Sequence, residues 1–256
     1  MIGVARFLRW MALVAFAAFV SAVPSRAPAQ SVDDFEDRSY TDGTYTLPYR
    51  LFVPTDYDPS QSYPIVLFLH GSGERGTDNR LQLTGQTAPL VFVRPENQVQ
   101  WPSFMIAPQC PPGGGWDHFG SEEPSTWMRL TLEVLDGLQQ EFSIDPSQLY
   151  ITGLSMGGFG TWDAITRYPG YFAGAVPIAG GGDTSVAYRA ADTPIWAFHG
   201  GADTTVPPQL ERAMIAAAVM DAGGDPLYTE YPGVGHVGSW NMAYAEPDLL
   251  PWLYSN

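Results

Sequence analysis

The sequence predicts an α/β protein in which a doubly wound, mostly parallel sheet carries helices on both faces. Short runs rich in β-branched and aromatic residues recur along the chain, and longer segments with apolar residues at helical spacing separate them. The runs are apolar at almost every position, which is typical of strands covered on both faces. Because strand and helix patterns alternate without a linker or an internal repeat, we expect one domain over residues 30–256.

Seven segments have the composition of strands. The first of them is expected to be antiparallel, and the second is a strongly apolar run that ends at Gly71. The predicted strands are 46–54, 63–71, 103–109, 148–153, 172–180, 194–200 and 226–233.

Helical patterns fall between and after these strands. In 125–142 a stripe of apolar side chains recurs at helical spacing, and Ser125 is a suitable N-cap. The predicted helices are 125–142, 157–169, 207–224 and a terminal segment, 239–256, interrupted near Pro247.

The first 29 residues have the pattern of a secretory signal peptide. Arg6 and Arg9 precede an uncharged apolar run over 10–25, and a small-x-small triplet ends at Ala29, where we expect cleavage. The alternative is a membrane anchor, but a span needs about 20 apolar residues and this run is shorter. We therefore expect a secreted or periplasmic protein with no membrane span in the mature chain.

Charge and cysteine content exclude several functions. All 12 basic residues are arginine, against 27 acidic residues, so the surface repels phosphate backbones and nucleic-acid binding is not expected. Cys110 is the single cysteine, which leaves no partner for an intrachain disulfide or a redox pair. No His/Cys/Asp cluster has metal-ligand spacing, and we expect neither metal nor organic cofactor.

A Gly-x-Ser-x-Gly frame lies between the predicted strand 148–153 and the helix 157–169. Its glycines are Gly153 and Gly157 and its serine is Ser155. By itself such a frame is also compatible with an ordinary glycine turn. A strand–turn–helix setting is what a nucleophile elbow requires, with the N–H of Met156 as the first donor of an oxyanion hole.

A nucleophilic serine needs a base and an orienting acid, which follow it in this fold class in the order Ser, acid, His. Only His199 and His236 follow Ser155. His199 ends an apolar strand and is interpreted as a structural histidine that closes a turn, whereas His236 lies in a glycine-flanked loop suited to a base. Asp203 follows a strand end and is the preferred acid, with Asp183 as its main competitor.

The second oxyanion donor and the substrate contacts have weaker sequence signals than the triad. The glycine-rich turn 70–76 offers the Ser72 N–H as the second oxyanion donor. Trp116 and His118, in a Gly- and Trp-rich loop, are candidate substrate contacts, although Trp116 is equally compatible with a packing role. No long insertion resembling a lid separates the strands, so we expect an open site.

The chain resembles the carboxylesterase/phospholipase-type α/β-hydrolases in four segments: YRLFVPTDYDPSQSYPIVLFLHGSGERGTDN, GLSMGGFGTWD, FHGGADTTVPP and GVGHVGSW. The similarity is greatest to secreted esterases often labelled "predicted peptidases", which are related to dienelactone hydrolases, feruloyl esterases and polyhydroxybutyrate depolymerases. It implies an α/β-hydrolase fold, a triad of Ser155, Asp203 and His236, and oxyanion donors at Ser72 and Met156.

The function expected from this resemblance is that of a serine carboxylesterase acting through an acyl-enzyme on short-acyl or aryl esters of the acetyl or feruloyl type. The open site favours soluble or polymer-attached esters of this kind over long-chain triglycerides. Three alternatives stay open at this point. The same triad serves a serine peptidase of prolyl-oligopeptidase-like type or a polyhydroxyalkanoate depolymerase, and the same fold serves a noncatalytic polymer-binding protein.

Overall fold

The computed structural model describes residues 31–256, except for the side chains of 218–222. The segment interpreted as a signal peptide, 1–29, lies outside the described residues, so its export and its cleavage after Ala29 stay predictions. In the part that is described, no helix has both the length and the apolar character needed to cross a membrane.

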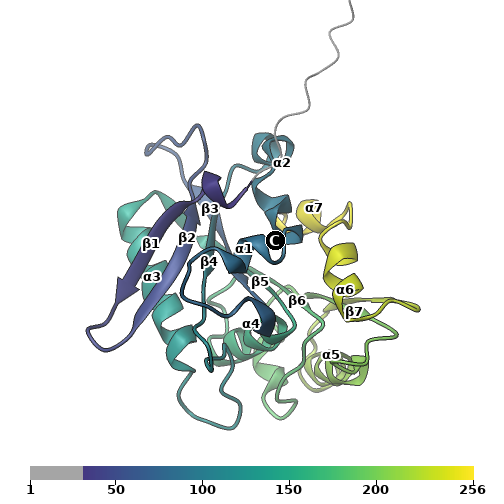
Figure 1. Ribbon diagram of the computed structural model, residues 1–256. Helices are drawn as coiled ribbons and strands as arrows, with labels where there is room; N and C mark the ends of the chain where they lie inside the picture. Colours follow the sequence, from purple (N-terminus) through teal and green to yellow (C-terminus); the bar gives the residue numbers. More distant parts are fainter. Residues whose placement is uncertain (1–30) are drawn as a thin grey trace, which may run out of the picture.

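The centre of the molecule is an eight-stranded sheet in the order β1-β2-β4-β3-β5-β6-β7-β8 (Figure 1). The first two strands are antiparallel to their neighbours, and the strands from β3 onward run parallel. The strands are β1 (Glu36–Thr41), β2 (Thr46–Phe52), β3 (Tyr63–Leu69), β4 (Phe104–Pro108), β5 (Ile144–Leu154), β6 (Gly174–Ile178), β7 (Trp196–Gly200) and β8 (Leu227–Tyr231).

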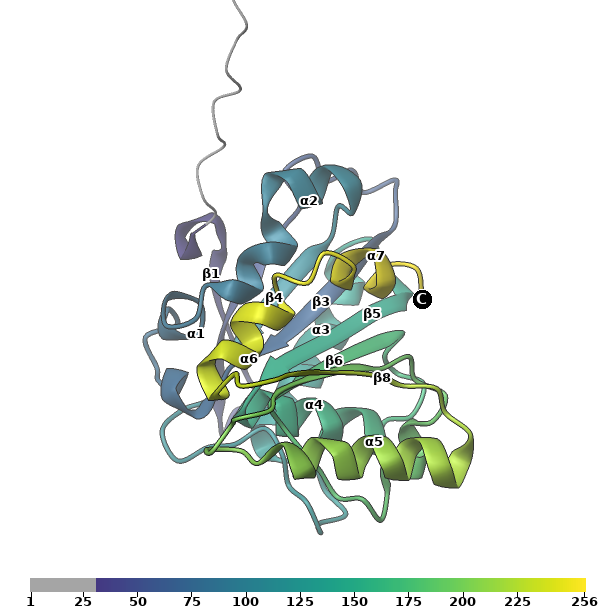
Figure 2. The same ribbon diagram turned by 90° about the vertical axis from the view of Figure 1, so that its right-hand side faces the viewer.

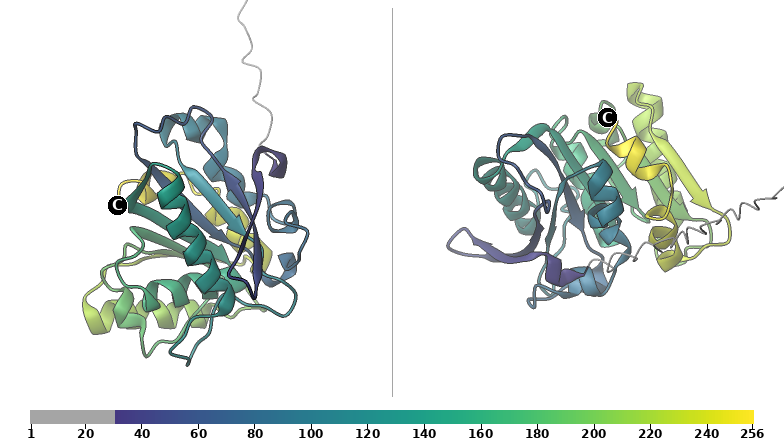
Figure 3. Two further views of the ribbon diagram at one scale, coloured as in Figure 1. Left: turned by 90° about the vertical axis from the view of Figure 1, so that its left-hand side faces the viewer. Right: turned by 90° about the horizontal axis from the view of Figure 1, so that it is seen from above.

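Helices cover both faces of this sheet (Figures 2 and 3). The α-helices are α1 (Leu81–Thr84), α2 (Pro95–Gln100), α3 (Thr126–Glu141), α4 (Met156–Arg167), α5 (Pro208–Ala222), α6 (His236–Ala243) and α7 (Leu249–Leu253). Four short 3-10 helices are η1 (Val32–Asp34), η2 (Ser72–Glu74), η3 (Ala88–Val93) and η4 (Ala187–Ala190). Side chains of α3, α4 and α5 join one buried cluster, and those of α1, η3, α6 and α7 join the other.

The strand β3 shows why the predicted runs are apolar at every position. Ile65, Leu67 and Leu69 enter the cluster under α3 and α4, while Val66 and Phe68 enter the cluster under α6 and α7. Successive side chains of a strand point to opposite faces of the sheet. A sheet between two helical layers therefore needs apolar residues at both odd and even positions of its strands. The predicted fold class is therefore confirmed, and no large lid covers the sheet in the described part of the chain.

Besides the 3-10 helices, three short elements were not expected from sequence. Strand β1 is a polar edge strand whose side chains are exposed or half-buried, so it has no apolar run to reveal it. Helices α1 and α2 lie outside the predicted helices, and neither is long enough to show a helical period. The segment around His236 was also interpreted as a loop, but His236 is the first residue of α6.

Cys110 should resist thiol reagents in the folded protein. Its side chain is fully buried, and burial raises the pKa of the thiol to about 12, against a smaller opposing effect of Arg75. Because the thiolate is the reactive form, we expect no reaction with Ellman's reagent at pH 8 until the chain is unfolded in guanidinium. Rapid reaction of the native protein would contradict this burial.

Candidate active site

Ser155 lies on the turn between the carboxyl end of β5 and the start of α4. Its backbone has φ 53° and ψ −116°, a conformation that a residue with a side chain rarely adopts. Its N–H donates to the carbonyl of Ile178 at 2.9 Å, which fixes the turn to the neighbouring strand β6. A strained serine held by a sheet on one side and a helix on the other is the arrangement of a nucleophile elbow.

The two glycines of the frame are required by close backbone contacts. A Cβ atom on Gly157 would collide with the carbonyl oxygen of Leu69, at the end of β3. A Cβ on Gly153 would collide with the backbone of Gly157 itself. Helix α4 can therefore leave the sheet at this sharp angle only when both positions lack a side chain.

Replacing Gly157 by alanine should lower the free energy of unfolding by about 3 kcal/mol, because the added methyl meets backbone that is fixed in the sheet. Urea denaturation measures this change. The matched control is Gly137→Ala in the exposed part of α3, where no atom lies within 4 Å of the added Cβ. That control should raise the free energy of unfolding by about 0.5–1 kcal/mol. Equal stability of Gly157→Ala and the wild type would contradict the close contact.

Three side chains distant in sequence meet above this turn. His236 Nε2 lies 2.9 Å from Ser155 Oγ, and His236 Nδ1 lies 2.6 Å from Asp203 Oδ2. With the Nδ1–H donated to Asp203, Nε2 carries the free lone pair that accepts the serine proton. The structure thus brings together the serine, base and acid expected from sequence.

The Asp203 carboxylate is buried and its two oxygens have separate partners. Oδ1 accepts from the N–H groups of Thr205 and Val206, each at 2.9 Å, and Oδ2 faces His236. Burial opposes ionisation, but the hydrogen bonds from His236 and these two amides hold the pKa of Asp203 below its usual value. The competing acid, Asp183, instead accepts from Ser185 in its own turn.

His236 is positioned by the first turn of α6. Gly235 is the N-cap residue, and the ring of Trp240, one turn later, packs edge-on against the imidazole with centroids 4.9 Å apart. The indole N–H of Trp240 donates to Gln86 at 2.8 Å, so the ring that supports the imidazole is fixed in turn. The imidazole keeps 16% of its side-chain surface exposed, which leaves it accessible to a substrate.

Two backbone amides near Ser155 are available to bind an oxyanion. The Met156 N–H is at the N-terminus of α4, and the Ser72 N–H begins η2. Neither donates to a protein acceptor within residues 31–256. A Cβ placed on Gly71 would lie 3.6 Å from Ser155 Cβ, so the Ser72 loop adjoins the serine. This geometry is compatible with the expected oxyanion hole.

His70, which sequence reasoning did not single out, fixes the Ser72 loop. The ring is fully buried; Nδ1 donates to the carbonyl of Gly71 at 2.6 Å and Nε2 accepts from the N–H of Cys110 at 3.0 Å. Burial lowers its pKa to about 4, so the ring is neutral and can both donate and accept. Its only sequence signal is its position at the end of β3.

The two candidate substrate contacts have different surroundings. Trp116 is fully buried, its indole N–H donates to the carbonyl of His70 at 3.0 Å, and its Cβ packs against Gly160. It is a packing residue, not a pocket wall. His118 is exposed, its ring faces the carbonyl of Glu123 in its own loop, and its carbonyl accepts from Arg167 at the C-terminal end of α4. Neither side chain hydrogen-bonds to a triad residue, so contact of His118 with a substrate stays a prediction.

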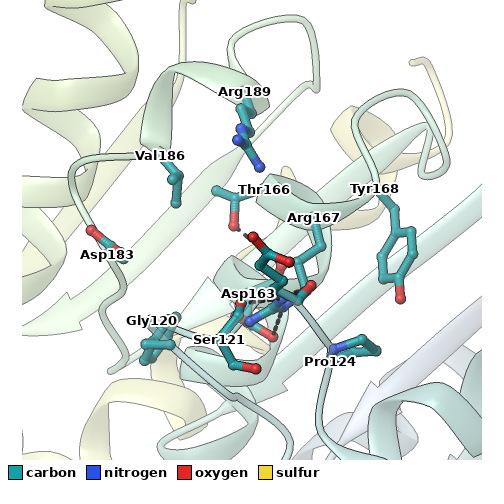
Figure 4. Close-up of a pocket in the computed structure, with 12 residues that line it drawn as sticks. Gly120, Ser121, Pro124, Asp163, Thr166, Arg167, Tyr168, Asp183, Val186 and Arg189 are labelled. Atoms are coloured by element: carbon teal, nitrogen blue, oxygen red, sulfur yellow. Dashed lines mark hydrogen bonds and ion pairs between the residues drawn. The ribbon is translucent and has the colours of Figure 1, made fainter.

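A surface cavity of about 310 Å³ opens beside the C-terminal half of α4 (Figure 4). Asp163, Thr166 and Arg167 line it, and Thr166 lies roughly 16 Å along the helix axis from Ser155. The Asp163–Arg167 ion pair, at 2.7 Å, spans part of its wall. This cavity is therefore separate from the serine.

The strand order, the two helical layers and the elbow after β5 define an α/β-hydrolase. Within that class, the chain belongs to the family described as "Putative esterase", whose model matches residues 45–217. A solved structure described as a thermostable esterase is 41% identical and has a TM-score of 0.82 over 88% of this chain and 63% of its own. The chain thus spans less than two thirds of that protein.

Two curated relatives are also similar. A rice (Oryza sativa subsp. japonica) protein described as a "Probable carboxylesterase" is 28% identical over 68% of this chain and 81% of its own. Poly(3-hydroxyalkanoate) depolymerase C of Paucimonas lemoignei is 37% identical over 40% of this chain, which corresponds to 21% of the depolymerase. The family and these relatives identify an esterase-type α/β-hydrolase.

Proposed function

We propose that this protein is a serine carboxylesterase that hydrolyses short-acyl or aryl esters through an acyl-enzyme on Ser155. The observation that carries the proposal is the hydrogen-bonded series Ser155–His236–Asp203 at the tip of the elbow. Membership of the esterase family and likeness to a solved esterase support ester hydrolysis as the chemistry.

In the first half-reaction Ser155 Oγ attacks the ester carbonyl carbon while His236 Nε2 takes the serine proton. The resulting oxyanion is stabilised by the N–H groups of Ser72 and Met156, each contributing about 3 kcal/mol. When the C–O bond to the alcohol breaks, His236 gives its proton to the leaving alkoxide. Asp203 holds the ring orientation and stabilises the imidazolium that exists between these two transfers.

In the second half-reaction water takes the place of the alcohol. His236 removes a proton from water as its oxygen attacks the acyl carbon, and then returns that proton to Ser155 Oγ as the acid leaves. The triad and the two amides are thus used twice, once for each tetrahedral intermediate.

Access to the serine supports small or polymer-attached esters over long-chain lipids. No large lid covers the sheet edge within residues 31–256, which favours an open approach to Ser155. The half-buried ring of Phe159 follows Ser155 by one helical turn and lies edge-on to Phe119, with centroids 6.3 Å apart. An aromatic ring one helical turn from the nucleophile suits an aryl or short acyl group.

Activity on a matched panel of esters and one amide tests the proposal. We expect p-nitrophenyl acetate, p-nitrophenyl butyrate or methyl ferulate to be hydrolysed with a kcat/KM at least about 100 times that of alanyl-p-nitroanilide. Release of 3-hydroxybutyrate from poly(3-hydroxybutyrate), included because of the depolymerase relative, would place the substrate among polymer esters. Faster hydrolysis of the anilide would overturn the proposal in favour of a peptidase.

A further inference from the structure

His199, near the end of β7, contacts the same carboxylate oxygen of the triad acid as His236 does. Its ring is fully buried, and Nε2 lies 2.9 Å from the carbonyl oxygen of Val206 and 3.3 Å from Asp203 Oδ2. His236 Nδ1 approaches the same oxygen at 2.6 Å. Asp203 Oδ2 therefore lies between two imidazole rings, of which the esterase mechanism uses one.

Behind His199 lies a second buried acid, Glu211 of α5. Its Oε1 accepts from the indole N–H of Trp162, and its Oε2 accepts from the N–H of Gly180 at 2.8 Å. Glu211 Oε2 lies 3.5 Å from His199 Nδ1, which has no hydrogen-bond partner of its own among the described residues. The mechanism assigns no role to this carboxylate.

The surroundings of His199 favour the doubly protonated ring. Both nitrogens face only acceptors: Glu211 at Nδ1, and Val206 O with Asp203 at Nε2. Burial lowers the pKa of His199, but the nearby Glu211 carboxylate, the Val206 carbonyl and the Asp203 charge outweigh it and raise the pKa above the usual value. A buried imidazolium between two carboxylates is paired on both sides.

We propose that His199, supported by Glu211, is a positioning residue that holds a positive charge against Asp203 and so sets the acid limit of the pH range in which His236 acts as the base. The inference rests on the proposed esterase function, since its main readout is catalytic. Without the His199 charge, the Asp203 carboxylate would be less compensated and would favour protonation of His236. The enzyme would then lose activity at a higher pH.

The other charged groups around His199 are few. On β8, Glu230 pairs in register with His199 but binds Arg212 of α5, and Tyr228 donates to Glu230 at 2.7 Å. The neighbouring strand β6 carries no ionisable side chain. Glu211 and Asp203 are therefore the two charges that bear most directly on the His199 ring.

The test is the pH dependence of kcat/KM for p-nitrophenyl acetate in His199→Gln and Glu211→Gln. The acid limb is the pH range in which kcat/KM falls as the pH is lowered. For His199→Gln, whose amide can still donate to Val206 O, we expect the midpoint of this limb to move up by about one pH unit. For Glu211→Gln we expect a smaller upward shift, because His199 then loses its proton. In the double variant, Glu211→Gln should add no further upward shift to that of His199→Gln.

The sign of the Glu211→Gln shift is decisive. If His199 were neutral, removing the Glu211 charge would only take away a nearby negative charge, and the acid limb would move down. Glu230→Gln is the matched control, since it removes a carboxylate that is already paired with Arg212, and it should leave the limb nearly unchanged. A uniform loss of rate in His199→Gln with an unmoved limb would show a merely structural histidine and overturn the inference.

Nuclear magnetic resonance keeps the test independent of how the His199 variants fold. The chain has four histidines, and His118→Gln removes the signal of the exposed ring. Comparison with His236→Gln then assigns the His236 signal, so the two remaining signals belong to the buried rings. At pH 7.5 we expect one of the two buried rings to have the carbon-13 shift of an imidazolium and the other, His70, that of a neutral ring. Two neutral buried rings would contradict the inference.

The two proposals fail in different ways. If the wild type does not hydrolyse p-nitrophenyl acetate in a Ser155-dependent manner, the esterase function is wrong. If that activity is present but the acid limbs and the histidine resonances are as for a neutral His199, only the role of His199 is wrong.

Discussion

Replacing Ser155 by alanine should lower kcat for a p-nitrophenyl ester by about four to six orders of magnitude. The variant keeps the amides of Met156 and Ser72, so it can still bind a developing oxyanion, but no side-chain oxygen remains to form the acyl-enzyme. A residual rate above that of water alone is expected from this hole and from substrate binding. The measurement is release of p-nitrophenol under saturating ester.

The matched control is Ser147→Ala, at the opposite end of the same strand β5. The Ser147 hydroxyl donates to Asp145 at 2.6 Å on the surface and has no contact with the triad. Both variants should unfold at nearly the wild-type temperature, and only Ser155→Ala should be inactive. Substantial activity in Ser155→Ala, at wild-type stability, would show that another group is the nucleophile.

The substitution Asp203→Asn should reduce kcat about 10⁴-fold while leaving the fold intact. The amides of Thr205 and Val206 both donate to Oδ1, so the asparagine side chain must place its oxygen there. Its NH₂ group would then face His236 Nδ1, which has to become the acceptor. The proton moves to Nε2, and the ring can no longer take the proton of Ser155.

Asp183→Asn is the control for this prediction, because Asp183 is the alternative acid by sequence. Its carboxylate accepts from Ser185 at the surface, and that interaction survives in an amide. Nearly wild-type kcat is expected. Loss of activity in Asp183→Asn together with an active Asp203→Asn would reverse the assignment of the acid.

The sheet and most of its helices were predictable because burial on both faces forces a continuous apolar signal. The seven predicted strands are all present, and the helix over 125–142 begins after its Ser125 cap. The chain order of serine, acid and histidine was equally informative, since it reduced the choice of base to two residues. The structure brings Ser155, His236 and Asp203 within hydrogen-bond distance of one another in series.

The features that sequence missed are those without a local pattern. Strand β1 is exposed, so its pairing with β2 leaves no hydrophobic record. Trp116 was ambiguous because an aromatic side chain in a glycine-rich loop can face solvent or the core, and only the tertiary structure decides. His199 does close a turn at Val206 O, as expected, but its contact with Asp203 depends on how the loop after β7 folds back.

Labelling with a fluorophosphonate probe, followed by mass spectrometry of the digested protein, tests the central claim most directly. The probe reacts only with a serine that an adjacent base activates. The arrangement of Ser155, His236 and Asp203 predicts stoichiometric labelling of the peptide that contains Ser155, and its loss in His236→Ala. Failure of the folded wild type to label, or labelling at any other residue, would contradict it.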